Sequence, residues 1–262
     1  MREYLTVEEN LRCAMRFFGE ATGTGEVRAL DRTVAMYSGL EYGVFNISLL
    51  TRPATNNDGG LAAALTEAAL YFKKRTKRWS FWLCEDLLDA ATRRRMRQTC
   101  NDFGLRPISY PPGMMASKLL PPVRPLPKIE CRAVQDEMTR CAFAEITSIC
   151  FEIPPAIATA VYGPASAWNG AYKGFVGLVD GKPIAIAAMV RAAGALGIYS
   201  LGTLPAQRHQ GYGEALLRAA ATASRPASSV DPFILQSTDA GHGLYRRMGF
   251  RDVTKFTVYL TR

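Results

Sequence analysis

Two short segments in the C-terminal half of the sequence contain residue types that bind anions and transfer protons. The first, LPAQRHQGYG at 204–213, lies between an apolar run expected to form a strand and an apolar run expected to form a helix. Backbone N–H groups at a helix N-terminus have no partner inside the helix and lie at the positive end of its dipole. Glycines let a bulky anion reach this backbone, and an arginine adds a fixed positive charge. The segment therefore predicts a phosphate-binding loop.

The residues expected to line this loop are Arg208, His209, Gln210, Gly211, Tyr212 and Gly213. Two glycines after a strand are more often only a turn that begins a helix, so this motif alone is a weak signal. Two other phosphate motifs do not fit. A dinucleotide-binding fingerprint requires a third glycine where Leu216 stands, and a P-loop requires Gly-Lys-Ser or Gly-Lys-Thr after the turn.

The second segment, LYRRMGF at 244–250, places the phenol of Tyr245 shortly before a glycine that is expected to end a helix. A phenol is a proton donor that general acid catalysis can use. The alternative interpretation is a core tyrosine that packs against the end of a helix. The order and spacing of the two segments make the pair much more specific than either segment alone.

In this order and spacing the two segments resemble the GNAT acetyltransferase superfamily. The family's loop, Arg/Gln-x-x-Gly-x-Gly/Ala, holds the pyrophosphate of acetyl-CoA, and Arg208, Gly211 and Gly213 match it. In the family's Tyr-x-x-x-Gly-Phe segment, the tyrosine often protonates the departing CoA thiolate, and Tyr245 begins the matching segment here. The resemblance covers roughly residues 128–262. It implies the mixed α/β GNAT acyl-CoA acetyltransferase fold, with acetyl-CoA as co-substrate and no metal.

The resemblance also implies how the reactants lie. The pantetheine amides pair with the backbone of Leu201 and Thr203, on the strand that leads into the loop. A small-molecule or peptide amine attacks the thioester directly in a ternary complex, with Tyr245 as general acid. Four aromatic residues either line the acceptor pocket or belong to the core, and the core is the favoured interpretation for the first of them: Phe151, Tyr162, Trp168 and Tyr172.

Two departures from the family pattern concern catalysis. Many GNAT enzymes have a glutamate on or near the strand that leads into the loop, but residues 195–204 contain no carboxylate. Glu152 and Tyr199 are the remaining candidates for the general base. Thr238 stands where many relatives have an asparagine. The alternative function is therefore a CoA-binding sensor or interaction protein with little turnover.

Proline-rich residues 107–127 divide the chain. Prolines at this density favour an extended connector over a helix, so we expect one domain over 1–106 and a catalytic GNAT domain over 128–262. Asp180-Gly181 between two apolar runs predicts a type I′ hairpin turn. Apolar patterning predicts helices at 134–151, 156–162, 211–223 and 243–248, and strands at 174–179, 183–190, 196–204, 232–236 and 255–260.

The N-terminal half resembles a degenerate copy of the C-terminal half. After a shift of 152 residues, TRPA at 51–54 aligns with TLPA at 203–206, and Gly59 aligns with Gly211. The residues of the predicted site are replaced: Arg208 by Asn56, Gln210 by Asp58, Gly213 by Leu61 and, with a gap, Tyr245 by Cys100. A carboxylate and a bulky side chain oppose a pyrophosphate. We therefore expect two tandem GNAT-like domains, of which the first has lost its cofactor.

Composition limits the remaining functions. The 262-residue chain is 48% hydrophobic and 21% charged, as in ordinary globular proteins. The net charge of +9 is spread over both halves and is densest at 73–78 and 93–97, where a solvated helix face is favoured over nucleic-acid binding. Six cysteines without metal-ligand spacing predict no metal site. Without a long apolar run or a signal region, we expect a cytoplasmic protein with no membrane span.

Overall fold

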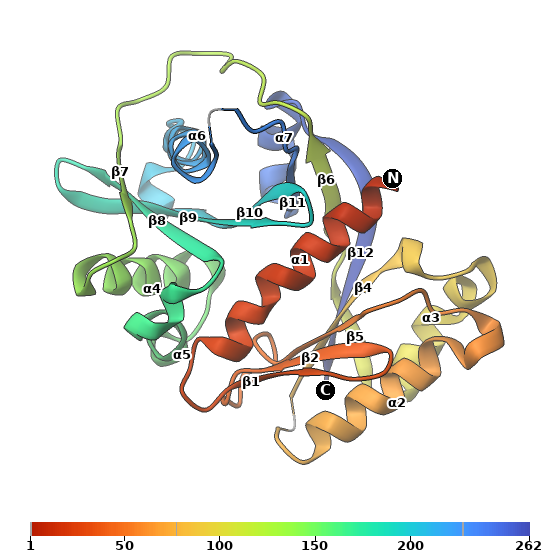
Figure 1. Cartoon of the computed structure of the whole chain (residues 1–262). Helices are drawn as coiled ribbons and strands as arrows, with labels where there is room; N and C mark the ends of the chain where they lie inside the picture. The colour runs from red at the N-terminus through yellow and green to blue at the C-terminus, as the bar shows by residue number, and fades with distance from the viewer. Residues whose placement is uncertain (1, 77, 227) are drawn as a thin grey trace. The chain divides into compact units, whose positions relative to one another are not determined.

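A computed structural model describes residues 2–76, 78–226 and 228–262 of the chain (Figure 1). Lys77, in one of the basic runs, and the side chain of Asp58 lie outside this description. The chain forms two compact units. The first unit consists of Met1–Phe17 and Met114–Arg251, and the second consists of Phe18–Gly113 and Asp252–Arg262.

The two units do not follow the domain boundaries expected from the sequence. Each unit contains a terminal segment of the chain that the sequence assigns to the other domain. Helix α1 (Glu3–Glu20) begins in the first unit, and strand β12 (Arg251–Thr261) lies almost entirely in the second. The expected connector contains part of strand β5 (Leu105–Ser109) and all of β6 (Pro112–Ala116). Proline is compatible with both strands, because β5 pairs with one neighbour, β12, and because a proline is the first residue of β6.

The first unit is a mixed sheet with helices on both faces. Its strands lie in the order β6-β11-β10-β9-β8-β7; β10 and β11 are parallel, and β7 to β10 form an antiparallel meander. Helix α6 covers one face of the sheet, and α4 and α5 lie on the other (Figure 1). The bounds are β7 (Glu130–Ala133), α4 (Glu137–Phe151), α5 (Pro155–Tyr162), β8 (Tyr172–Val179), β9 (Lys182–Ala192), β10 (Ala195–Thr203), α6 (Tyr212–Ser224), β11 (Phe233–Gln236) and α7 (Asp239–Arg247).

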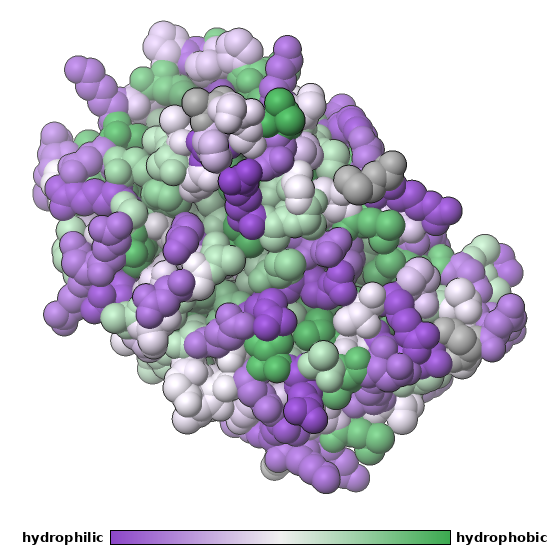
Figure 2. Space-filling model, viewed as in Figure 1, coloured by the Kyte–Doolittle hydropathy of each residue, from purple (hydrophilic) through white to green (hydrophobic). Residues whose placement is uncertain are grey.

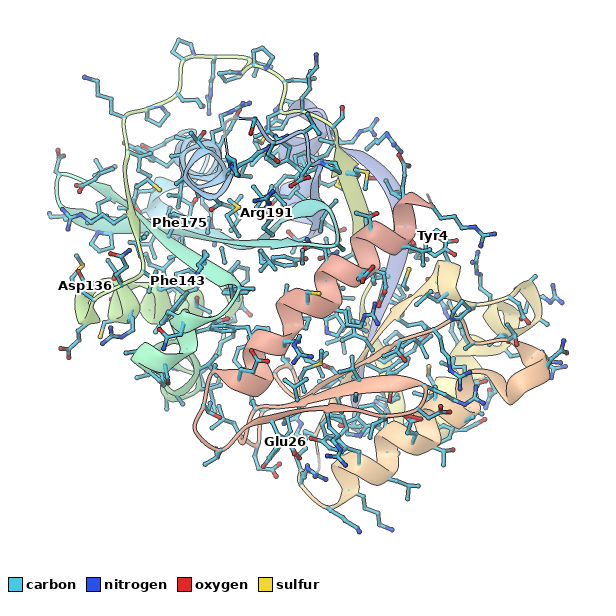
Figure 3. The ribbon with its side chains drawn as sticks, viewed as in Figure 1. Tyr4, Glu26, Asp136, Phe143, Phe175 and Arg191 are labelled. Atoms are coloured by element: carbon cyan, nitrogen blue, oxygen red, sulfur yellow. The ribbon has the colours of Figure 1, made fainter. Side chains whose placement is uncertain are left out.

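The elements expected in this unit are confirmed, with shifted ends. The hairpin turn has the positive φ angles of type I′, 50° at Asp180 and 74° at Gly181. The carboxylate of Asp136 caps the N-terminus of α4, where Figure 3 labels it. Helix α7 begins earlier than expected, because the Thr238 hydroxyl accepts a 3.3 Å hydrogen bond from Gly241 N–H and caps the first turn.

The second unit repeats this strand order. Strands β1 to β3 form an antiparallel meander, β3 and β4 are parallel, and β4 and β5 each pair antiparallel with β12. Gly59 before α2 has φ 81°, and the aligned Gly211 before α6 has φ 95°, which supports the internal repeat. The bounds are β1 (Glu26–Ala29), β2 (Thr33–Tyr37), β3 (Ile47–Leu50), α2 (Gly60–Lys73), β4 (Ser80–Cys84) and α3 (Ala90–Asp102).

Hydrophilic and apolar residues are interspersed on the face of the protein that Figure 2 shows. In α3, Arg93, Arg94 and Arg95 are exposed, and Arg93 forms a 3.1 Å ion pair with Asp86. These arginines form the solvated helix face that the sequence predicts. Among the described residues, no helix is both long enough and apolar enough to cross a membrane.

Helix α1 is anchored within the first unit by a fully buried asparagine. The side-chain amide of Asn10 donates to three backbone carbonyls around the β9–β10 turn, those of Val190 at 3.2 Å, Ala192 at 2.8 Å and Ala195 at 3.1 Å. Its side-chain oxygen accepts a 2.7 Å hydrogen bond from the Tyr199 hydroxyl on β10. Both polar groups of Asn10 are therefore satisfied without water.

We expect Asn10→Leu to destabilise the protein strongly. Leucine has a similar size but leaves several buried polar groups without partners, and each of these costs about 1–3 kcal/mol. Tyr199→Phe removes one of the four bonds and should cost less. The double variant should lose less than the sum of the single losses, because the two side chains share a bond. Denaturant unfolding measures all three variants, and wild-type stability of Asn10→Leu contradicts the anchoring role.

Helix α1 also carries a buried carboxylic acid, Glu8, which is 4% exposed. Burial raises the pKa of Glu8 from its usual value near 4.5 to about 7, although Arg12 Nε, 3.5 Å from Glu8 Oε1, opposes this shift. Because the folded-state pKa is the higher one, the folded protein binds more protons than the unfolded chain between these two pH values. Rising pH therefore works against folding across this window.

The free energy of unfolding should fall as the pH rises from 4.5 to 7, with a contribution from Glu8 on the order of 3 kcal/mol. Glu8→Gln should abolish this contribution and stabilise the protein above pH 7. Glu9→Gln, at the exposed neighbouring position, is the matched control and should keep the slope. Urea unfolding across the window measures the effect. A slope that survives in Glu8→Gln means that another group causes it.

Candidate active site

The candidate site lies in the first unit, where β10 separates from β11. Among the described residues, these parallel strands pair at two positions, Leu196 with Phe233 and Gly197 with Ile234. Beyond them β10 continues, bonded to β9 along its other edge. From Ile198 onward, the edge of β10 toward β11 has no strand partner among the described residues. Its backbone groups are therefore available to an extended ligand.

A bulge in β10 accompanies this separation. The register with β9 shifts after Tyr199, Leu201 has no partner in β9, and Ser200 has a left-handed φ of 45°. The hydroxyls of Tyr172 and Ser200 share a 2.8 Å hydrogen bond, and the preceding tyrosine is bonded to Asn10. The bulge is thus held from β8 and from α1.

The two candidates for the general base lie in different environments. Tyr199 is unsuited to the role. Burial raises its pKa well above 10, so the phenol stays protonated, and its hydroxyl already donates to Asn10. Glu152 is exposed and has a left-handed φ of 55° at the end of α4. Its role as a base stays a prediction.

The loop after β10 enters α6 through a short turn of 3₁₀ helix, η4 (Pro205–Gln207). Arg208 Nε donates to the Thr203 carbonyl at 3.0 Å, and Gln210 Nε2 donates to a carbonyl of η4 at 3.1 Å. Among the described residues, the backbone N–H groups of 210–213 have no hydrogen-bond acceptor. The positive end of α6 therefore presents a row of unsatisfied donors, which is the arrangement that binds an anion.

Both loop glycines have a structural reason as well. Gly211 has φ 95°, and a side chain there would come within 3.0 Å of Pro127. Gly213 has no positive φ, and a side chain there would come within 3.0 Å of the Thr203 hydroxyl, at the end of β10. His209, with φ 64°, is the second residue of the loop in the left-handed region, after Gly211. A substitution at Gly213 therefore introduces a side chain into the loop with less backbone strain than a substitution at Gly211.

Tyr245 lies on α7, in the hydrophobic core of the first unit. Its ring is 8% exposed and packs edge-on against Phe250, with the ring centroids 5.7 Å apart. A phenol is protonated at neutral pH, and burial raises the pKa of this one further. Among the described residues, no hydrogen bond of its hydroxyl is found. Leu201 and Tyr212 pack against the same core, which thus joins β10, α6 and α7.

Three of the aromatic residues considered for the acceptor pocket form a buried cluster instead. Tyr162, Trp168 and Tyr172 are each at most 8% exposed. Phe17 and Phe143 complete the cluster, with ring centroids 4.3 Å apart for Phe17 and Tyr172 and 4.9 Å apart for Phe143 and Trp168. Figure 3 labels Phe143 beside α4 and β8. The core interpretation is therefore the correct one for these three residues.

Phe151 is the exception, and the preference for a core position is wrong for it. It is 39% exposed at the end of α4, because the left-handed residue after it ends the helix there. A side chain at Gly202 would come within 3.4 Å of the Phe151 ring and 3.1 Å of Cys150. Burial raises the pKa of Cys150, and the nearby Arg208 opposes the shift. The sequence gives no signal for this contact between the end of α4 and the end of β10.

In the second unit the corresponding opening is closed. Strands β3 and β4 pair at three positions, and beyond them a parallel bridge joins Ala54 to Leu88. The N–H of Ala54 donates to the Leu87 carbonyl at 2.9 Å. Leu61 and Cys100, which replace the second glycine and the tyrosine of the repeat, are at most 1% exposed. The side chain of Asp58 lies outside the described part of the chain.

Comparison with known proteins relates this geometry to one family. Residues 171–252 match the model of the acetyltransferase (GNAT) domain family. No curated protein matches the sequence. Among solved structures, a GCN5-related N-acetyltransferase from Kribbella flavida is similar over 98% of this chain and 95% of its own, with a TM-score of 0.71 and 17% sequence identity.

Two further structures have the same fold. A functionally unknown conserved protein from Staphylococcus epidermidis matches 93% of this chain and 94% of its own, with a TM-score of 0.62 and 13% identity. A GCN5-related N-acetyltransferase-like protein from Streptococcus suis matches 97% and 98%, with a TM-score of 0.53 and 14% identity. These matches extend over both halves of the sequence. The chain therefore has a tandem GNAT fold, and the part of it that matches the acetyltransferase (GNAT) domain model, residues 171–252, lies almost entirely in the first unit.

Proposed function

We propose that the protein is an acetyl-CoA-dependent N-acetyltransferase with one active site, in the first unit. The observation that carries this proposal is the free edge of β10, which leads directly into the unsatisfied N–H donors of 210–213. Acetyl-CoA, a thioester with an extended arm that contains amides and with a pyrophosphate, fits a strand edge followed by a helix N-terminus. Its amides pair with a strand edge, and its phosphates bind at a helix N-terminus.

The proposal gives each binding residue predicted from the sequence a contact with acetyl-CoA. The backbone of Leu201 and Thr203 binds the amides of the pantetheine arm. Arg208 contributes positive charge through the guanidinium N–H groups that do not bond within the loop. Backbone donors surround the pyrophosphate, and they come from His209, Gln210, Gly211, Tyr212 and Gly213.

The proposed reaction is direct attack of a primary amine on the thioester carbonyl. The new C–N bond forms, the C–S bond breaks, and the acetyl group moves to the amine. Tyr245, a phenol that is protonated at neutral pH, donates a proton to the departing thiolate. A base, for which the exposed Glu152 is our candidate, takes the proton of the amine. Holding both reactants in line supplies much of the acceleration.

We also propose that the second unit binds no acetyl-CoA. Two observations support this: the bridge from Ala54 to Leu88 closes the equivalent strand edge, and Leu61 fills the position of the loop glycine. The expected stoichiometry is therefore one acetyl-CoA per chain.

The proposal is tested by calorimetric titration with acetyl-CoA and by release of free CoA thiol in the presence of amines. The panel includes amino acids, polyamines, aminoglycosides and peptide N-termini. Gly213→Val should abolish binding, because its side chain obstructs the pyrophosphate, and Gly170→Val, at a glycine with open space around it, should not. Binding without turnover on any amine favours the alternative, a CoA-binding sensor. Unchanged binding by Gly213→Val contradicts the location of the site.

Tyr245→Phe should keep the ring packing and remove only the proton donor. General acids contribute roughly 10²–10⁴-fold, so kcat should fall by an amount in this range or somewhat less. The affinity for acetyl-CoA and the melting temperature should stay close to those of the wild type. Steady-state kinetics with an amine found in the panel measure the effect. Wild-type kcat in this variant assigns Tyr245 to packing alone.

A further inference from the structure

The segment between β6 and β7 is fastened to the same helices that carry the proposed site. In Figure 1 it arches over α6. Near its start, Leu120 N–H donates to the Met248 carbonyl at 3.0 Å, and the Leu120 carbonyl accepts a 2.6 Å hydrogen bond from Arg218 on α6. A side chain at Gly249 would come within 2.9 Å of the Leu120 side chain, so these two residues lie in close contact. This stretch of the predicted connector therefore has a defined position on α6 and α7.

A second attachment lies at the phosphate-binding loop itself. Arg124 Nη2 donates to the His209 carbonyl at 2.8 Å. Pro127 packs against Gly211, at the point where α6 begins. Residues 120–127, which we call the strap, thus run along one side of the loop and end beside its first glycine.

The strap adds a cation to this loop. Arg124 is exposed, and one hydrogen bond to His209 leaves other donors of its guanidinium available to a ligand. Arg208 lies in the same loop, with its Nε bonded to the strand end. Glu214, the acid in the first turn of α6, is bonded to Arg218 at 2.7 Å, so its charge is compensated. The loop is therefore flanked by two arginines and is favourable for more than one phosphate group.

We propose that Arg124 binds the 3′-phosphate of CoA and that the strap forms one wall of the CoA site. The inference rests on the proposed function. CoA carries a pyrophosphate and a separate phosphate on the ribose. With the pyrophosphate on the N–H donors of 210–213, the second phosphate needs a cation outside the first turn of α6, and Arg124 is bonded to the loop immediately before those donors. A planar guanidinium is suited to bidentate contact with a phosphate.

The test compares CoA with dephospho-CoA, which lacks only the 3′-phosphate. Calorimetric titration of the full chain with both ligands is done for wild type, Arg124→Gln and a control, Arg132→Gln. The control removes an exposed arginine of β7 that pairs with Glu130. Arg124→Gln should weaken CoA binding about tenfold or more and leave dephospho-CoA binding unchanged. The wild type and the control should both prefer CoA by a similar factor.

Three outcomes overturn the assignment in distinguishable ways. If Arg124→Gln binds CoA as the wild type does, Arg124 does not contact the ligand. If it weakens CoA and dephospho-CoA equally, the contact is not with the 3′-phosphate. If the wild type binds neither ligand, the proposed function fails together with the inference. Thermal unfolding of both variants checks that each has the wild-type melting temperature, as expected for exposed side chains.

Discussion

The arrangement of the site depends on how β10 leaves β11 while it remains hydrogen-bonded to β9. Pairing with β11 ends at Gly197, and a bulge with a left-handed serine, Ser200, follows in β10. Such a backbone conformation at a residue other than glycine costs on the order of 1–3 kcal/mol and persists only when its surroundings hold it. Tyr172 and the Asn10–Tyr199 pair hold it here. The loop and the first turn of α6 take their direction from the end of this strand.

Polar groups around β10 fall into two kinds. Those of Asn10, Tyr172 and Tyr199 have partners and lie among closely packed aromatic rings, where an unpaired group would be expensive to bury. For those of the loop at 210–213 and the Tyr245 hydroxyl, no hydrogen bond is found within the described chain. The satisfied groups keep the strand rigid, and the unsatisfied groups are the ones available to a ligand. The aromatic packing also leaves Phe151, at the end of α4, as the exposed ring beside the bulge.

Sequence patterns predicted the local features well, because each depends on neighbouring residues. The Asp180-Gly181 turn, helix α6 after Gly211 and the helix that carries Tyr245 are all present. What sequence reasoning missed depends on contacts between distant residues. Nothing near Asn10 indicates that its partners lie about 180 positions later, and nothing in β12 indicates which unit it joins. Prolines predicted an extended connector before β7, but some of that chain is paired as strands and some is bonded to α6 and α7.

The exchange of chain ends between the units affects how the protein is made. On the ribosome, residues 18–113 are translated well before β12, the strand that completes the sheet they form. Helix α1 is translated well before the strands whose backbone carbonyls bind Asn10. Until β12 is translated, β4 has an open edge, and open strand edges invite aggregation. Cutting the gene within the proline-rich connector would therefore separate each unit from a segment that it contains.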